Sequence, residues 1–532
     1  SITGIRMVGD DNIYDSGIHI LHNYCFANCE KLKYVIMPIA IDTIGESIVE
    51  NCNDLEAIYY LGSESLWNQV EIQPYNDKLM STPVYYYMER QPNTEGKYWH
   101  FDDDGNPSVW DEIRPTVGLS YSLKSDGTYE FTGRGSSGNP EIRIAKTYDG
   151  AAVTSIAARA LENDTGIVSV IIPNSVTSIG GYAFSGCSNL TRITIPNSVT
   201  LIGDEAFSYC DSLTSITIPN SVISIGGAAF GYCKGLTSIT IPDSVTSIGD
   251  EAFLGCNSLA SITIGNGVTS IGKYAFYQCS VLKDVMFDES SNLANIDQYA
   301  FAESGIENIT IPNSVTTIGD YAFKGSTLIS AIIGDGVTSI GEYAFADCAT
   351  LKAITVGNGV RSIGMYAFYN CYALTGVYIK DLQALENWCN IVFRDGANEE
   401  FPSSNPLVYA SRLFINNELV EHLQIPEGVL GISDRVFYGC DSLTSIVIPN
   451  SVGSIGNEAF RDCSLVETVY LGVYDGYAPH PSNLHTIKRK AFYDCPNIAA
   501  VIYNGSKVNW DTYITFESGN ESLLNAEISY KH

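Results

Sequence analysis

A 23-residue segment recurs along this chain and constrains its fold more than any other feature. Residues 172–194 read IPNSVTSIGGYAFSGCSNLTRIT, and residues 195–217 read IPNSVTLIGDEAFSYCDSLTSIT. Self-similarity at a fixed period of about 20 to 50 residues is typical of a solenoid, in which each coil buries its apolar face only against its neighbours. We therefore predict a stack of coils, one for each repeat.

Within one repeat, the residues from Leu190 to Pro196 alternate as a short strand does. Ile193 is expected to point into the core and Thr194 to point outward, because successive strand side chains face opposite sides. Pro196 ends the strand, since proline cannot donate to a ladder of hydrogen bonds. We predict that these segments pair in parallel from coil to coil, and that the AFxxC segment holds at most one helical turn.

The repeats divide the chain into a short array, a break and a long array. The segment that follows Tyr60 contains Trp67, and a related segment near the other end contains Trp510 at the same spacing, so both are interpreted as caps that plug the core. We predict a short array with a cap-like end at 1–88, a linker at 89–118, a β-hairpin opening the second array at 119–150, and a main array at 151–532 with irregular coils at 380–425 and a cap-like end at 502–532.

Twelve of the 14 cysteines lie three residues after the second residue of the AF site, one in each coil. Strands of neighbouring coils are about 4.8 Å apart, which is too far for good disulfide geometry between in-register side chains. We predict free, buried thiols that act as small apolar groups with a weak donor. Cys25 and Cys389 fall outside this row and are expected to be core or partly buried thiols.

The net charge of −31 argues against nucleic acid or an anionic membrane surface as a partner, because both require basic patches. No apolar run is long enough to cross a bilayer, so membrane insertion is not expected. The chain begins at Ser1 without a signal-like segment, and we expect a mature or excised chain whose targeting segment has been removed.

Three short motifs were tested for chemistry. Residues 133–138 read GRGSSG, but an expected strand follows them, whereas a nucleotide site requires a helix. Residues 102–106 read DDDGN but lack the EF-hand spacing, and His480 and His485 have no ligand partner nearby in sequence. We predict no catalytic residue, no cofactor and no metal.

Two outward rows remain as candidate partner-binding residues. The first row holds threonine at the outward strand position, and β-branched residues also fill sheet faces for packing alone. The second row holds tyrosine two residues before phenylalanine; such rows anchor interfaces, but tyrosine also covers apolar flanks. The candidates are Thr194, Thr217, Thr240, Thr263, Tyr274, Tyr299, Tyr321, Tyr343 and Tyr366.

The order Leu190-x-x-Ile193-x-Ile195-x-x-Val199-x-x-Ile202 matches the leucine-rich repeat spacing. Together with the IPNSVTSIG and AFxGC signatures, it resembles the BspA-like (bacterial surface protein) leucine-rich repeat family. The resemblance implies an α/β repeat fold, a leucine-rich-repeat solenoid with a parallel β-sheet face and short helical or irregular turns.

The same resemblance implies a secreted or cell-surface, extracellular module that is not an enzyme. Its expected partner is a protein ligand on host matrix or a neighbouring cell, as in adhesion. The alternatives are a structural spacer that displays another domain and a carbohydrate-binding surface module. The sequence leaves the oligomeric state open.

Overall fold

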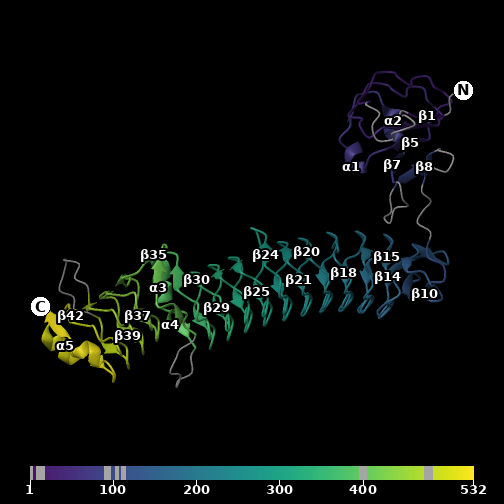
Figure 1. The fold of residues 1–532 in the computed structure, drawn as a ribbon. Helices are drawn as coiled ribbons and strands as arrows, with labels where there is room; N and C mark the ends of the chain where they lie inside the picture. Colours follow the sequence, from purple (N-terminus) through teal and green to yellow (C-terminus); the bar gives the residue numbers. More distant parts are fainter. Residues whose placement is uncertain are drawn as a thin grey trace. The chain divides into compact units, whose positions relative to one another are not determined.

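The chain was analysed as a computed structural model, which describes residues 4–6, 18–88, 97–101, 107–109, 115–394, 404–472 and 483–531. It divides into two compact units (Figure 1). The first unit is Ser1–Thr116 with Arg143–Ala145, and the second is Val117–Ile142 with Lys146–His532.

The described residues of the first unit form two sheets and two short helices. Its larger sheet is parallel except for its last pair, which is antiparallel. That sheet has the order β1 (Gly4–Arg6), β3 (Tyr34–Met37), β5 (Ala57–Tyr60), β7 (Val84–Tyr87), β8 (Tyr98–Phe101) and β9 (Pro107–Val109). The smaller sheet has the order β2 (Ile20–Leu21), β4 (Thr43–Ile44) and β6 (Glu71–Ile72), and the helices are α1 (Glu64–Trp67) and α2 (Asp77–Ser81).

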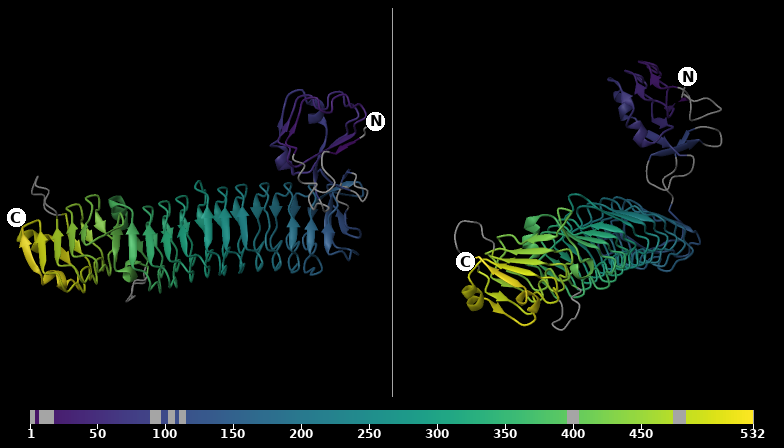
Figure 2. Two further views of the ribbon diagram at one scale, coloured as in Figure 1. Left: turned by 45° about the horizontal axis from the view of Figure 1, so that its top comes forward. Right: turned by 60° about the vertical axis from the view of Figure 1, so that its left-hand side comes forward.

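In the second unit, the LTSIT-type segments lie side by side on one side of the coils, which we call the strand face (Figure 2). They pair in parallel and in register, as Thr240 does with Thr263, so the predicted pairing from coil to coil is confirmed. The strand face consists of four sheets in series. They are β12 (Glu141–Arg143), β15 (Ser169–Ile171), β17 (Arg192–Thr194); β20 (Ser238–Ile241), β22 (Ser261–Ile264), β24 (Asp284–Phe287); β26 (Asn308–Thr310), β28 (Ser330–Ile332), β30 (Ala353–Val356), β32 (Gly376–Ile379), β34 (Leu413–Ile415), β35 (Glu418–Leu419); and β36 (His422–Gln424), β38 (Ser445–Ile448), β40 (Thr468–Leu471), β42 (Ala500–Tyr503), β44 (Glu527–Tyr530).

A second ladder of two-residue strands runs along the coils and was not anticipated from the sequence. Each of these strands is a Ser-Ile or similar pair, which is too short to show an alternating pattern. A 14-stranded sheet begins with three longer strands and two antiparallel pairs, and then continues as parallel pairs of two-residue strands. It comprises β10 (Ser120–Leu123), β11 (Tyr129–Gly133), β13 (Thr147–Tyr148), β14 (Ala151–Ile156), β16 (Ser178–Ile179), β18 (Leu201–Ile202), β19 (Ser224–Ile225), β21 (Ser247–Ile248), β23 (Ser270–Ile271), β25 (Asn295–Ile296), β27 (Thr317–Ile318), β29 (Ser339–Ile340), β31 (Ser362–Ile363) and β33 (Val392–Phe393). A four-stranded sheet follows, with β37 (Gly431–Ile432), β39 (Ser454–Ile455), β41 (Thr486–Ile487) and β43 (Thr515–Phe516).

The AFxxC segments form the third side of each coil, which we call the turn side. They contain hydrogen-bonded turns and no helix of more than one turn in the described coils, which agrees with the expectation of at most one helical turn there. The residue two before phenylalanine has a positive φ, for example 60° at Tyr321, which interrupts a right-handed helix. The backbone N–H of Phe184 instead donates to the carbonyl of Ala206 in the next coil, with 2.8 Å between nitrogen and oxygen.

The core of the second unit contains two stacks of one phenylalanine per coil, from Phe184 to Phe368 and from Phe437 to Phe492. The rings of Phe184 and Phe207 are parallel within 4°, with their centroids 5.2 Å apart, and the stack continues at 5.3 Å to Phe230. All of these rings are fully buried. Each coil therefore depends on the next one for its apolar interior.

The cysteine row lies beside this stack. All 14 cysteines are free, as predicted for the row, and eleven of the twelve row members are buried, Cys29 being half-exposed. Most of their thiols donate to a carbonyl of the preceding coil; the sulfur of Cys210 lies 3.2 Å from the carbonyl oxygen of Phe184. The row therefore adds one weak hydrogen bond between most neighbouring coils.

Among the described coils, three carry helix pairs, and each contains one tryptophan and a buried asparagine just before its second helix. The pairs are α1 with α2, α3 (Leu382–Trp388) with α4 (Leu407–Ala410), and α5 (Lys507–Tyr513) with α6 (Glu521–Leu524). The tryptophans are Trp67, Trp388 and Trp510, and the asparagines are Asn76, Asn405 and Asn520. Each asparagine amide donates to a main-chain carbonyl of an adjacent coil, at 2.7 to 2.9 Å. The second of these coils lies inside the long array.

Candidate functional site

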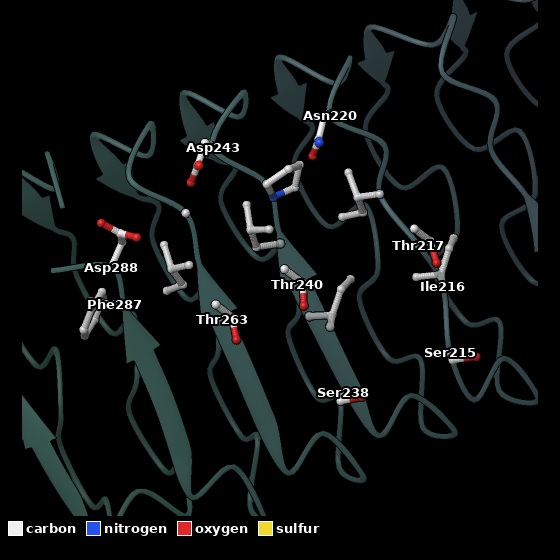
Figure 3. Close-up of a pocket in the computed structure, with 16 residues that line it drawn as sticks. Ser215, Ile216, Thr217, Asn220, Ser238, Thr240, Asp243, Thr263, Phe287 and Asp288 are labelled. Carbon is white, nitrogen blue, oxygen red and sulfur yellow. The ribbon is translucent and has the colours of Figure 1, made fainter. Parts of the chain in front are cut away.

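Among the described residues of the second unit, depressions lie along the strand face, and three of them are lined as follows. The first depression, of about 650 Å³, spans four coils. Figure 3 shows its floor, where Thr217, Thr240 and Thr263 lie in one row on successive coils. Asn220, Asp243 and Asp288 lie where the chain leaves the strand segments, so two carboxylates border a floor of hydroxyl groups.

The two other depressions lie further along the same face and have volumes of about 430 Å³ and 770 Å³. The smaller one is lined by Thr310, Thr355 and Tyr378. The ring of Tyr378 stacks on Phe414 with centroids 4.6 Å apart. The larger one has a mixed lining of polar and apolar side chains, and its apolar members include Met286 and Ile332, which are 51% and 46% exposed.

The first and the largest depressions lie where the sheet of the strand face is interrupted. Residues 213–218 and 236–241 both read LTSITI, but only the second copy forms a strand, β20. The described backbone of Ser215–Ile218 makes no hydrogen bond to other backbone groups. A second interruption separates β24 from β26, which belong to different sheets, and the largest depression contains residues of both strands.

The side chains at the rim are held in place by contacts between coils. A side-chain oxygen of Asp243 accepts from the backbone N–H of Asn266 at 2.9 Å, and Asn313 accepts from Asp335 in the same way at 2.9 Å. Asp335 then accepts from the N–H of Asn358 at 2.9 Å. Contacts with the main chain therefore hold the rim in place. Asp243 and Asp335 each use one carboxylate oxygen in these contacts.

The four candidate threonines occupy one outward strand row. Thr217, Thr240 and Thr263 line the first depression, whereas Thr194 pairs with Ile171 in the preceding sheet and lies outside it. Further along, the row contains Met286 in register with Thr263, and Ile332 in register with Thr310. Sequence reasoning missed these apolar members, although aligning the repeats by their opening leucine would have found them.

The five candidate tyrosines lie on the turn side and do not line the depressions. They form a second ring stack in which neighbouring centroids are 4.5 to 4.9 Å apart. Each residue is half-buried and has φ between 53° and 60°. Burial, followed by the neighbouring Tyr321 and Tyr274, raises the pKa of Tyr299. Much of each ring face is covered by the next ring, so the stack presents mainly ring edges and hydroxyl groups.

The motifs that were tested for chemistry have the following structures. Residues 133–138 connect β11 to β12, so a strand rather than a helix follows the glycines. Arg134 within this turn forms an ion pair with Asp164 at 2.9 Å. Residues 102–106 and His480 lie outside the described residues, and His485 bonds its neighbour Thr486 at 2.9 Å.

Two searches covered the described part of the chain. Among those residues, no group of three or more His, Cys, Asp or Glu side chains is arranged to hold a metal ion. The helices that the structure describes include none with the length and apolar character required to cross a membrane.

The stacked coils and the in-register parallel strands define a leucine-rich repeat solenoid. The family model for the BspA type leucine rich repeat region matches residues 11–68, 154–283, 200–330, 271–398 and 409–528. The chain belongs to this family, whose members are generally non-catalytic and whose repeats serve protein interaction. A search of the curated proteins found no match.

Several solved structures are similar to this chain. A leucine-rich repeat protein from Bacteroides ovatus is 25% identical, with 79% of this chain and 100% of that chain covered and a TM-score of 0.44. A leucine-rich cell surface protein from Faecalibacterium prausnitzii is 25% identical, with coverage of 77% and 99% and a TM-score of 0.32. A leucine-rich repeat protein from T. pallidum is 31% identical over 33% of this chain and 82% of that chain, with a TM-score of 0.32.

Proposed function

We propose that this chain is a non-catalytic, adhesion-type module, secreted or attached to the cell surface, that captures a protein ligand on host matrix or a neighbouring cell. Membership in the BspA-type family supports a role in protein interaction. Within the second unit, the strand face is the binding surface, and the threonine row forms its floor.

The observation that carries this proposal is the occurrence of three depressions on one face. They follow one another along the strand face, and together they are lined by residues from Ser215 to Asn417. A surface of this length fits an extended segment or an elongated partner better than a small molecule.

The charge of the chain indicates what kind of partner is steered to this surface. The net charge is −31, and Asp243 and Asp288 border the first depression. A negative surface of this kind accelerates association with basic proteins, and the acceleration falls as salt screens the field. The ligand is therefore a protein with a basic binding region.

The test uses the full chain as bait for extracellular-matrix and cell-surface extracts, followed by titration of the protein that is captured. Thr240→Arg with Thr263→Arg places two cations on the floor, and we expect at least a tenfold loss of affinity. Thr246→Arg is the matched control, because Thr246 is exposed but lies outside the strand face. Equal affinity of the floor variant and the control would refute binding through this face.

The tyrosine stack is examined with a separate variant. Replacing Tyr299, Tyr321 and Tyr343 together by serine removes three neighbouring rings of the stack. If binding uses the strand face alone, this variant keeps the affinity of the unaltered chain. A loss of affinity that matches the floor variant would extend the interface to the turn side.

A further inference from the structure

In the first unit, the outward row of the larger sheet is covered by a side chain of the protein itself, Trp99. Trp99 is fully buried, and its ring lies 5.1 Å from that of Tyr59 and 5.3 Å from that of Tyr87. Its indole Nε1–H donates to the carbonyl oxygen of Tyr60, with 3.1 Å between nitrogen and oxygen. Ile36 and Leu61 complete this cluster.

The residues around Trp99 hold the same coil positions as the lining of the largest depression in the second unit. Ile36, Tyr59 and Tyr85 form one outward row of parallel partners. Counted from the leucine or isoleucine that opens each strand segment, this row corresponds to Met286, Thr310 and Ile332. By the same count, Leu61 corresponds to Pro312, which also lines the depression.

A main-chain acceptor is also present in this depression. At several coils a residue other than proline follows the strand, and its N–H donates to the carbonyl of the coil before it; Leu61 donates to Met37 at 3.0 Å and Gly265 donates to Ile241 at 2.9 Å. Pro312 has no N–H to give to the carbonyl of Phe287. Phe287 and Tyr60, which accepts the indole of Trp99, share the same coil position.

We propose that the depression lined by Met286, Phe287, Thr310, Pro312 and Ile332 is a tryptophan-binding pocket for a partner protein. The indole packs on Met286 and Ile332, and its Nε1–H donates to the Phe287 carbonyl oxygen. The inference deepens the proposed function and rests on it, since it names the side chain that the captured protein presents. Asp288 and Glu289 at the rim favour a lysine or arginine next to that tryptophan.

The other two depressions are less suited to an indole. The outward row of the first holds three threonines, and the aliphatic side chains of its lining are buried, whereas Met286 and Ile332 of the largest are exposed. The second is the smallest of the three, at about 430 Å³, and does not include Met286. Of the three depressions, the largest is the one lined by Met286, and it combines the exposed Met286 and Ile332 side chains with a carbonyl to which Pro312 has no N–H to give.

The test is methyl NMR of the full chain labelled with ¹³C at its six methionine methyl groups. The probe is N-acetyl-tryptophanamide, and Met286→Leu assigns the Met286 resonance. We expect the Met286 methyl to shift upfield and to saturate with the probe, because an indole face lies over it. Met80, which is 68% exposed in the first unit, is the internal control and is expected to stay in place.

The contribution of the carbonyl is measured with the 1-methylindole analogue, which has the same shape but no N–H. A net hydrogen bond of about 1 kcal/mol predicts that this analogue binds roughly fivefold more weakly. Equal affinity of the two probes would contradict a hydrogen bond from the indole to the Phe287 carbonyl oxygen.

Ile332→Asp tests the apolar wall, with Leu430→Asp as the matched control because Leu430 is 75% exposed at another place in the second unit. We expect Ile332→Asp to abolish the Met286 shift and Leu430→Asp to preserve it. A Met286 resonance that does not move in the unaltered chain, or moves no more than Met80, would overturn the pocket. That result leaves protein capture by the strand face standing if the extract experiment still succeeds, so the two proposals fail separately.

Discussion

The thiol of Cys233 donates to the carbonyl oxygen of Phe207, one coil earlier in the array, with 3.0 Å between sulfur and oxygen. The same contact recurs between Cys256 and Phe230 at 3.1 Å. Where serine takes the cysteine position, as at Ser326, its hydroxyl donates within its own coil instead, to Phe323 at 2.7 Å. The thiol at this position is therefore part of how most neighbouring coils are joined.

Replacing Cys233 by alanine is expected to destabilise the second unit by about 1–2 kcal/mol, because it leaves a small cavity and removes the donor. Cys233→Ser is expected to cost less, since Ser326 shows that a hydroxyl is accommodated. Hydrogen exchange of peptides from residues 205–255 measures both variants. A larger loss for serine than for alanine would contradict the role of the donor.

The cysteine row also predicts a loss of stability at alkaline pH. Burial raises the pKa of Cys279 and Cys348 from 9.0 to about 12. The folded protein thus holds these protons while the unfolded chain releases them above pH 9, so stability is complete below that value and falls as the pH rises toward 12. We expect the thermal midpoint to decline across this range, and to decline less when Cys279 and Cys348 are both serine. Identical profiles for the two proteins would assign the decline to other groups.

A substitution at Gly267 tests how closely neighbouring coils pack. Most neighbouring repeats have serine at this position, such as Ser244, whose hydroxyl donates to Val222 at 2.7 Å. A Cβ atom at Gly267 would collide with the carbonyl oxygen of Asp243, which cannot move without moving the coil. Gly267→Ser is therefore expected to destabilise by about 1–3 kcal/mol, although it restores the commoner residue. Circular dichroism during thermal unfolding measures the change, with Ser244→Gly as its counterpart.

Trp99 is expected to hold the first unit together. Trp99→Ala leaves a large void and should destabilise that unit by about 3–5 kcal/mol, whereas Trp99→Phe retains much of the packing and loses only the indole donor. Hydrogen exchange reports the two units separately. Faster exchange in the second unit than in residues 30–87 would argue against a local role for this side chain.

Much of the fold could be predicted from the sequence because each repeat packs against its neighbours in the same way. The alternation around Ile193 predicts the strand, and the spacing of Phe184 and Phe207 predicts the ring stack, since each residue meets its own counterpart one coil away. The two-residue strands were missed because a pair such as Ser224–Ile225 is too short to carry a periodic signal.

The position of the depressions could not be predicted in the same way. Two copies of LTSITI differ in structure, so the interruption near Ser215 depends on how neighbouring coils fit rather than on the local residues. The left-handed conformation of Tyr321 could not be predicted either, because a tyrosine in the sequence does not indicate a positive φ.

The coil that carries α3 and α4 has a consequence for how this chain can change over time. Both ladders end there, at β33 and β35, and new ones start at β36 and β37. Across this joint, the Trp388 indole donates to Val436 at 3.2 Å and Asn405 donates to Arg435 at 2.7 Å. Blocks of coils on either side can thus be inserted, lost or exchanged as units, provided that Trp388 and Asn405 remain to join them.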